Sequence, residues 1–340
     1  MNLKSTFDKI TPLDSEAMKA AEERQGQLTK PAGSLGRLEA LSIQLAGITG
    51  EARPMFEQKA IVVMAGDHGV TAEGVSAFPA EVTPQMVMNF LFGGAAINAL
   101  SGVSGSQVMV VDMGVASELP AHNGLISKRI AAGTANMVQG PAMNTEQAVQ
   151  ALEAGIEVVN DLKAQGVSIV GLGDMGIGNT TPSAAIACAI MGTSPDDIVG
   201  RGTGVDDAGL KRKKDAVAKA IVKNEPDGAD GLDVLMKVGG FEIGGLAGVV
   251  LGAAANKMPV VVDGFITTAA ALIAAQICPA VKDYLIPSHC SQESGHEKML
   301  AHLGLKAMFD YEMRLGEGSG AALAMPVVDA AADPSPKRIS

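Results

Sequence analysis

Five short apolar runs, separated by helical segments, constrain the fold of this chain more than any other feature. The clearest helical segment, TEQAVQALEAGIEVVNDLKAQG, covers 145–166. Strands that are apolar throughout are buried on both faces, and their alternation with helices is typical of a parallel sheet covered on both sides. The pattern therefore predicts an α/β fold. The runs are AIVVM (60–64), QVMVVD (107–112), VSIVGL (167–172), PVVVD (259–263) and YLIPS (284–288).

Four of these runs end in a carboxylate close to glycine: Asp67, Asp112, Asp174 and Asp263. In open α/β sheets the ligand crevice lies outside the carboxyl ends of the strands, so four such acids converge if their strands are neighbours. Each acid could instead be an ordinary turn residue that caps the next helix. The recurrence in four places favours a shared site.

The run at 167–172 continues into a glycine-rich loop, GLGDMGIGNTTPSA. Its Gly171-x-Gly173-x-x-Gly176 spacing matches a dinucleotide-binding fingerprint, which also needs an acid about 20 residues further on, after a strand. Asp196 and Asp197 have that separation but lie in a turn, TSPDDIVG. The fingerprint is therefore incomplete.

The same loop runs into a helix start. Pro182 suits the first turn of a helix, and Asn179, Thr180 or Thr181 could be its N-cap. A glycine-rich turn that leads into a helix N-terminus binds anions through its backbone N–H groups. We predict a site for one phosphate here, not for a dinucleotide.

Two further loops have the same character. VGRGTGVDDAGLKRKKDAV (199–217) contains glycines that permit close approach of a ligand, and one lysine of its basic run could reach back to a phosphate, although such a run is usually a solvated helix face. LGEGSGAAL (315–323) isolates Glu317 among small residues. Glu317 is either an exposed turn residue or a catalytic base.

Composition excludes several classes of function. A net charge of −11 and the absence of tryptophan argue against nucleic-acid binding, which needs a basic face or stacking side chains. The apolar stretch GGLAGVVLGAAA (244–255) is shorter than the ~20 residues of a membrane helix, so we expect no membrane span. The three cysteines form no C-x-x-C pair, and the charged N-terminus resembles no secretory leader. These features predict a cytoplasmic protein.

Histidine spacing gives little support to a metal site. His68 adjoins Asp67, and His289, His296 and His302 lie near the last strand, but no H-x-x-x-H or H-E-x-x-H motif occurs. We therefore expect no metal and no cofactor.

The loops together resemble one family, the nicotinate-nucleotide:dimethylbenzimidazole phosphoribosyltransferases of cobalamin lower-ligand synthesis. The matching segments span 29–326, nearly the whole chain. They are TKPAGSLGRLE (29–39), AGDHGV (65–70), GVSAFPAEVTPQMVMNFLFGGAAIN (74–98), GDMGIGNTT (173–181), GRGTGVDD (200–207) and RLGEGSGAALAMP (314–326).

The resemblance implies a Rossmann-like, doubly wound parallel sheet as a large domain, which we place at 51–300. It also implies a small, mainly helical domain from both chain ends, 1–50 and 301–340, and a homodimer. The first fifty residues agree with this, since Asp14 is a plausible N-cap for SEAMKAAEERQGQL and RLEALSIQLAGITG has helical spacing.

The resemblance also implies a reaction between two small molecules. 5,6-Dimethylbenzimidazole attacks C1′ of nicotinate mononucleotide, nicotinate leaves, and α-ribazole 5′-phosphate forms with inversion. By its match to the family motif, Glu317 is the general base. The residues implied around the benzimidazole are Phe78, Gln85, Met313 and Leu315.

The nucleotide is expected to lie on the glycine loops and the strand ends. One position departs from the family, because Asp174 stands where the family usually has glutamate. The shorter side chain predicts retained phosphate binding and a reduced rate. The residues implied for the nucleotide are Asp174, Gly176, Ile177, Gly178, Asn179, Thr180, Gly202, Thr203, Gly204, Lys213, Asp263 and Ser291.

Three other functions remain open from the sequence. An NAD-type oxidoreductase could use the same fold, a non-catalytic module could bind the nucleotide without turnover, and a metal-dependent phosphohydrolase could use the acids at the strand ends.

Overall fold

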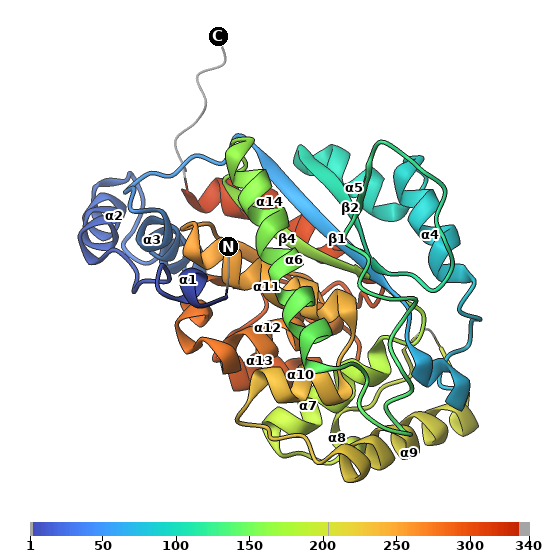
Figure 1. Ribbon diagram of the computed structural model, residues 1–340. Coiled ribbons are helices and arrows are strands. Elements are labelled where there is room, and N and C mark those ends of the chain that lie inside the picture. The colour runs from blue at the N-terminus through green and yellow to red at the C-terminus, as the bar shows by residue number, and fades with distance from the viewer. Residues whose placement is uncertain (1–2, 203, 333–340) are drawn as a thin grey trace.

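Six parallel strands form one sheet in the described part of the chain (Figure 1). The computed structural model describes residues 3–202 and 204–332. The strands lie in the order β3-β2-β1-β4-β5-β6, with every neighbouring pair parallel. This order is that of a doubly wound Rossmann sheet and confirms the predicted fold class. The strands are β1 (Lys59–Gly66), β2 (Ser106–Gly114), β3 (Leu125–Ser127), β4 (Ile169–Met175), β5 (Val260–Val262) and β6 (Leu285–Pro287).

All five predicted strands are present, and β3 is an addition at the sheet edge. The predicted helix over 145–166 is α6, which begins at Thr145 behind a capping box of Asn144 and Gln147. The described helices are α1 (Leu3–Phe7), α2 (Ser15–Gln27), α3 (Arg37–Thr49), η1 (Gly69–Glu73), α4 (Val82–Leu91), α5 (Ala96–Ser104), α6 (Thr145–Ala164), α7 (Thr180–Met191), α8 (Pro195–Ile198), α9 (Asp207–Asn224), α10 (Gly231–Val238), α11 (Phe241–Ala255), α12 (Phe265–Ile277), η2 (Pro279–Tyr284), α13 (His296–Leu303) and α14 (Ser319–Ala332).

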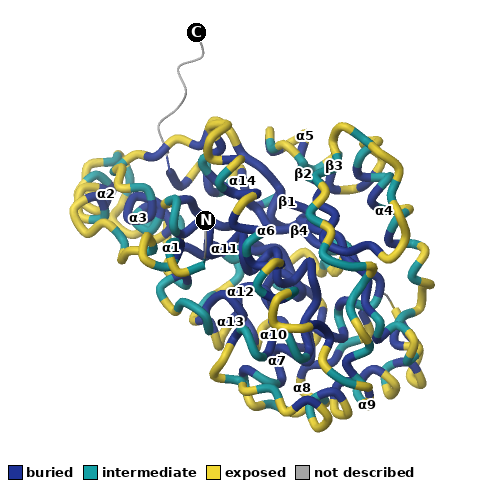
Figure 2. The backbone as a smooth tube through the Cα atoms, in the orientation of Figure 1, coloured by how far each residue is buried: buried dark blue, intermediate teal, exposed yellow. Residues whose placement is uncertain are grey.

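The central strand β1 separates two apolar cores. Its side chains alternate, so Val62 and Met64 pack with α6, α7, α11 and α12, whereas Ile61 and Val63 pack with α3, α4, α5 and α14. Figure 2 shows β1, β4 and α11 buried in the middle of the molecule, with exposed residues at the rim. Both faces of the sheet are therefore covered, as the continuous apolar runs predicted.

Glycines allow the central helices α6 and α11 to touch backbone to backbone. A Cβ atom at Gly155 would lie 1.9 Å from the Gly245 carbonyl oxygen, and one at Gly248 would lie 2.1 Å from that of Leu152. This contact is possible only without side chains. It explains why α11 is so rich in glycine and alanine.

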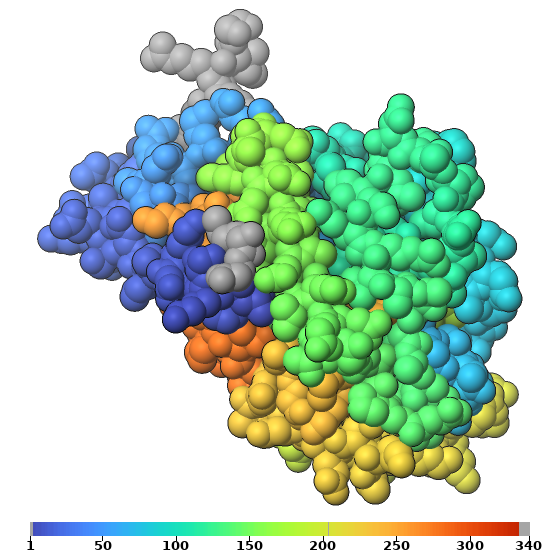
Figure 3. Space-filling view, viewed as in Figure 1, coloured from blue at the N-terminus to red at the C-terminus, as the bar shows by residue number. Residues whose placement is uncertain are grey.

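The N-terminal helices pack on residues from near the other end of the chain. Asp14 caps α2 as predicted, since its Oδ1 accepts the N–H groups of Glu16 and Ala17. Gln44 of α3 donates to the carbonyl oxygens of Asp283 and Leu285. In Figure 3 the blue N-terminal segment accordingly borders the orange segment. The division into a large domain at 51–300 and a small one from both ends stays a prediction.

Among the described residues, one segment is long and apolar enough to cross a membrane when judged only by length and composition. It is Val82–Ser104, not the stretch 244–255 that the sequence pointed to. In the structure this segment is two helices, α4 and α5, which end and begin on either side of residues 92–95. Such a feature is weak evidence for a span, because core helices of folded domains also meet the criterion.

Candidate active site

A cavity of about 270 Å³ opens at the carboxyl ends of β4, β5 and β6. This edge of the sheet lies beside the β1/β4 pair, where the strand order reverses, and such a switch point is the usual ligand site of a doubly wound sheet. The cavity is lined by Phe78, Val82, Met86, Asp174, Met175, Gly176, Ile177, Asn179, Thr180, Gly202, Gly264, Phe265, Ile266, His289, Ser291, Glu293, Arg314, Leu315, Gly316 and Glu317.

Glu317 stands in the cavity wall on a strained loop. Gly316, Glu317 and Gly318 have φ of 85°, 64° and 88°, so three successive residues are left-handed. For a non-glycine residue this conformation costs about 1–2 kcal/mol, and such strain collects at functional sites. Gly173 of β4 makes room for the loop, since a Cβ atom there would lie 2.6 Å from the Glu317 carbonyl oxygen.

The Glu317 carboxylate is buried and has one hydrogen-bond partner in the described part of the chain. Its Oε2 accepts the backbone N–H of Ile97, in the first turn of α5, at 3.2 Å. Burial raises the pKa of Glu317 above its ordinary value, and the Ile97 N–H opposes that rise. A carboxylate with a raised pKa is a stronger base than a solvated one, so the side chain is suited to take up a proton.

Asp174 faces the Glu317 loop from the end of β4. A Cβ atom at Gly316 would lie 3.3 Å from its Oδ1, and its Oδ2 accepts the side-chain N–H of Asn179 at 2.8 Å. Burial, with added repulsion from Glu242 and Glu317, raises the pKa of Asp174 to about 7, although the Asn179 bond favours the charged form. Asn179 precedes α7 as predicted, but its side chain binds Asp174 and does not cap the helix.

A buried cation lies beside another part of the cavity wall. Lys213 of α9 is almost fully buried, and its Nζ donates to Thr180 Oγ1 at 2.9 Å. A Cβ atom at Gly202 would lie 2.8 Å from that Nζ, so the Gly202 loop, α7 and Lys213 meet at one point. Burial lowers the pKa of Lys213, and the negative charge of Glu293 opposes this effect. Of the basic run at 211–214, Lys213 alone is buried, and the predicted contact of one of these lysines with a phosphate stays a prediction.

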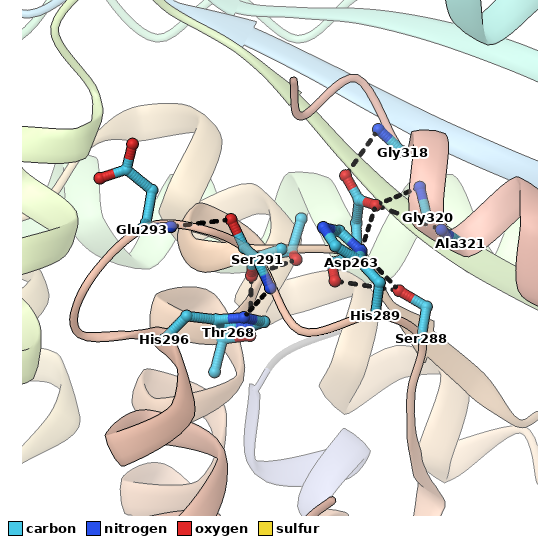
Figure 4. A network of polar contacts seen from close by, with 12 residues as sticks. Asp263, Thr268, Ser288, His289, Ser291, Glu293, His296, Gly318, Gly320 and Ala321 are labelled. Carbon is cyan, nitrogen blue, oxygen red and sulfur yellow. Dashed lines mark hydrogen bonds and ion pairs between the residues drawn. The ribbon is translucent and has the colours of Figure 1, made fainter. Parts of the chain in front are cut away.

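Ser291 lies in the loop between β6 and α13 (Figure 4). Its backbone N–H donates to His296 Nδ1 at 2.8 Å, and its Oγ accepts the N–H of Glu293 at 3.3 Å. Burial, with a smaller contribution from His289, lowers the pKa of His296 to about 3, so the ring is neutral. The loop is thereby fixed with Ser291 in the cavity wall.

The four strand-end acids do lie on neighbouring strands, but they do not all reach the cavity. Asp112 accepts the N–H groups of Gly114 and Val115, and Asp67 accepts that of Ala116, so these two stabilise turns. Asp174 lines the cavity, and Asp263 lies behind its wall. The expectation that all four converge on one site was wrong for Asp67 and Asp112.

Among the remaining predicted residues, Phe78 and Leu315 line the cavity mouth and are about half exposed. Gln85 is exposed, Met313 is half-buried, and neither contributes to the wall. Gly178 and Gly204 are left-handed turn residues outside the lining, and Thr203 lies outside the described residues.

Several residues of the cavity wall were not predicted from the sequence. Met86 lies one helical turn after Val82 on α4, a spacing that could have been recognised, and His289 follows β6 directly. Phe265 and Ile266 begin α12 without any polar signal. His68 pairs with Glu242 at 2.8 Å in the interior, and within residues 3–202 and 204–332 no three His, Cys, Asp or Glu side chains are grouped to hold a metal.

Comparison with known proteins identifies close relatives of this chain. A family model described as "Phosphoribosyltransferase" matches residues 10–335. Relatives from Roseiflexus sp. and Chloroflexus aggregans are 57% and 56% identical over 329 residues, covering 97% of this chain and 93% of each relative. Both are named nicotinate-nucleotide–dimethylbenzimidazole phosphoribosyltransferase.

Two solved structures from Thermus thermophilus have the same fold. One, of a protein with that same enzyme name, has a TM-score of 0.90 and 46% identity, covering 94% of this chain and 95% of the other. The second, named CobT, has a TM-score of 0.91 and 48% identity, covering 93% and 95%. The family match at residues 10–335 spans every residue of the cavity wall.

Proposed function

The chain belongs to the nicotinate-nucleotide–dimethylbenzimidazole phosphoribosyltransferase family, and we propose how its cavity carries out that transfer. It is a phosphoribosyltransferase of cobalamin lower-ligand synthesis. Nicotinate mononucleotide and 5,6-dimethylbenzimidazole are its proposed substrates, and α-ribazole 5′-phosphate and nicotinate its products. Family membership favours this function over an NAD-type oxidoreductase, a phosphohydrolase or a non-catalytic module.

The observation that carries the mechanism is the position of Glu317 and Lys213 in one site. The buried carboxylate is in the cavity wall, and the buried ammonium group meets that wall at Thr180 and Gly202. We assign the phosphate to Lys213, Thr180 and Ser291, and the benzimidazole to the apolar side formed by Val82 and Met86. A site with one charged end and one apolar end fits a phosphoribosyl donor and a flat, apolar acceptor.

The proposed reaction balances without a further reactant. One ring nitrogen of dimethylbenzimidazole forms a bond to C1′ while the bond from C1′ to the nicotinate nitrogen breaks. The electron pair of that bond returns to nicotinate, which leaves with a neutral ring nitrogen and therefore needs no acid. The proton on the second benzimidazole nitrogen passes to Glu317. Attack opposite to the leaving group inverts the configuration at C1′.

The pH dependence of turnover tests this mechanism. With both substrates and EDTA present, we expect nicotinate release and α-ribazole phosphate formation, with kcat/KM falling as the pH is lowered. Glu317 must be ionised to accept a proton, and burial raises its pKa, so the loss begins at a higher pH than for a solvated glutamate. Ionised Asp174 would stabilise positive charge building at C1′, so protonation near pH 7 should lower the rate further.

Asp174→Asn provides the control for that profile. It should remove the inflection near pH 7 and leave the acid limb set by Glu317 nearly in place, because Asp174 is already protonated at the lower pH where Glu317 titrates. A profile that is flat across this range, or turnover that stops in EDTA, would contradict the mechanism.

We also propose that the enzyme is a cytoplasmic homodimer. Phe78 and Leu315 are 51% and 56% exposed at the cavity mouth, and Phe92 is 74% exposed just after α4. A second subunit would cover such apolar side chains. The three cysteines are free, as in a reducing compartment. Light scattering that gives the mass of a single chain, or secretion of the protein in cell fractionation, would contradict these assignments.

A further inference from the structure

Asp263 lies at the end of β5 with its carboxylate turned toward the loop that carries Glu317 (Figure 4). Its Oδ2 accepts the N–H of Gly318 at 3.0 Å, and its Oδ1 accepts those of Gly320 at 2.6 Å and Ala321 at 3.2 Å. The side chain is 1% exposed and is absent from the cavity wall. Its hydrogen bonds to the loop therefore hold backbone, and His289 Nδ1, from the cavity wall, lies 3.6 Å from its Oδ1.

Asp263 acts as an N-terminal cap for α14 from a distant part of the chain. Gly318, Gly320 and Ala321 surround the start of α14, where the first N–H groups of a helix have no partner within the helix. Asp263, at the end of β5, supplies the acceptor, although it lies 55 to 58 residues before Gly318 and Ala321 in the sequence. A carboxylate at a helix N-terminus is also favoured by the helix dipole.

The approach is close on every side. A Cβ atom at Gly320 would lie 2.7 Å from Asp263 Oδ1 and 2.0 Å from His289 Nδ1. Ser288 Oγ donates to the Asp263 carbonyl oxygen at 3.0 Å, which fixes the backbone that bears the carboxylate. These contacts fix the position of the loop relative to the end of β5.

The loop that Asp263 holds is the one that contains the strained residue Glu317. Glu317 is left-handed between two left-handed glycines, and such a conformation persists only where surrounding contacts enforce it. Gly318, bonded to Asp263, is the next residue along the chain. Without Asp263 the loop can relax and carry the Glu317 carboxylate away from its place in the wall.

We propose that Asp263 is a positioning residue that acts through Glu317. It is then not a nucleotide-binding residue, which is the role that the family resemblance implied. The inference rests on the proposed function, in which Glu317 is the base. Displacement of a catalytic group by about 1 Å can cost about 100-fold in rate. The loss should therefore appear in kcat, while binding of nicotinate mononucleotide stays nearly unchanged.

His296 provides a contrasting position in the same network. Thr268 Oγ1 donates to the Gly264 carbonyl oxygen, so it accepts from His296 Nε2, and His296 Nδ1 accepts the Ser291 N–H. The ring therefore holds the phosphate side of the site as Asp263 holds the base side. His296→Gln keeps a group near Thr268 but loses the acceptor for Ser291, so it should raise the KM for nicotinate mononucleotide.

The test is a double-mutant cycle with Asp263→Asn and Glu317→Gln. An asparagine at 263 puts an N–H₂ donor opposite a backbone N–H and breaks at least one bond to the loop. We expect Asp263→Asn to lower kcat by about 10- to 100-fold with less than about a 3-fold change in KM. In the Glu317→Gln background it should cost less than about 3-fold more, since the group it positions is gone.

A second readout follows the loop directly. Hydrogen exchange at amides 318–321 should be slow in the wild type and fast in Asp263→Asn, while amides 291–296 keep their protection. Asp263→Ser, which retains one acceptor oxygen, serves if the asparagine variant does not fold. Failure of both to fold would contradict the proposal, because Asp263 would then be needed by the whole sheet and not by one loop.

The outcomes separate this inference from the proposed function. If Glu317→Gln alone leaves kcat unchanged, the assignment of the base fails. If Glu317→Gln is impaired but Asp263→Asn raises KM at unchanged kcat, Asp263 binds nucleotide and the positioning role is overturned. The positioning role would also be overturned if the fold losses in kcat of the two single variants multiply in the double variant.

Discussion

Glu317→Gln is expected to lower kcat for α-ribazole phosphate formation by roughly 10²- to 10⁴-fold, the usual contribution of a positioned general base. The substitution preserves shape, and its side-chain oxygen can still accept the Ile97 N–H, so the loop should keep its place. What is lost is the ability to take the proton from the attacking benzimidazole. The KM for nicotinate mononucleotide should change by less than about 3-fold, since Glu317 faces the acceptor side. Steady-state kinetics with detection of nicotinate and of the product measure both quantities.

Glu312→Gln is the matched control for this prediction. Glu312 lies five residues before Glu317 in the same segment and is also left-handed, with φ of 55°, but its side chain is exposed and outside the cavity wall. It should leave kcat within about 2-fold of the wild type. If Glu312→Gln and Glu317→Gln lower kcat equally, the effect comes from any change of charge in this segment. The assignment of Glu317 as the general base would then be wrong.

Lys213→Met is expected to have the second-largest effect, on binding of the nucleotide. Methionine fills most of the volume of the lysine stem but removes the ammonium group that meets Thr180 and the Gly202 loop. A hydrogen bond to a charged group contributes about 1.5–3 kcal/mol, which corresponds to roughly a 10- to 150-fold rise in KM for nicotinate mononucleotide. The KM for dimethylbenzimidazole should stay nearly constant. Calorimetric titration with nicotinate mononucleotide would report the loss of affinity without turnover.

Lys214→Met separates this effect from a general loss of positive charge. Lys214 is the next residue on α9, but its Nζ pairs with Asp196 at 2.8 Å and its side chain is 31% exposed. Its replacement should alter KM by less than about 2-fold, because exposed ion pairs contribute little. If Lys213→Met lowers kcat and leaves KM unchanged, the ammonium group stabilises the transition state and does not contribute to binding of the nucleotide.

Most of the fold was predictable because the sheet has a strong local signature. Strands buried on both faces are apolar along their length, and β1, β4, β5 and β6 follow this rule except near strand ends, at Lys59 and Asp174. The edge strand β3 has three residues, Leu125–Ser127, which are partly or fully exposed. It therefore lacks that signature, and only its pairing with β2 identifies it.

The loops that form the site were predictable from the sequence, but the contacts that each of their acidic residues makes were not. Asp67, Asp112, Asp174 and Asp263 have the same local pattern, an acid close to glycine at the end of an apolar run. Their partners differ: two accept N–H groups near β2, one accepts the amide of Asn179, and one accepts the start of α14. Those partners come from elements that the sequence does not place, so the four acids could not be told apart.

The sequence by itself determined the strands, the glycine loops and the residue types at each strand end, because burial on both faces and left-handed turns are requirements that a short segment satisfies alone. Only the tertiary structure decided that Lys213 turns inward and that Glu317 is buried. Both depend on close approach of distant segments: the Gly202 loop to Lys213, and the 316–318 loop to Gly173. The energy of a buried charge depends on the atoms around it, and those atoms become neighbours only when the chain has folded.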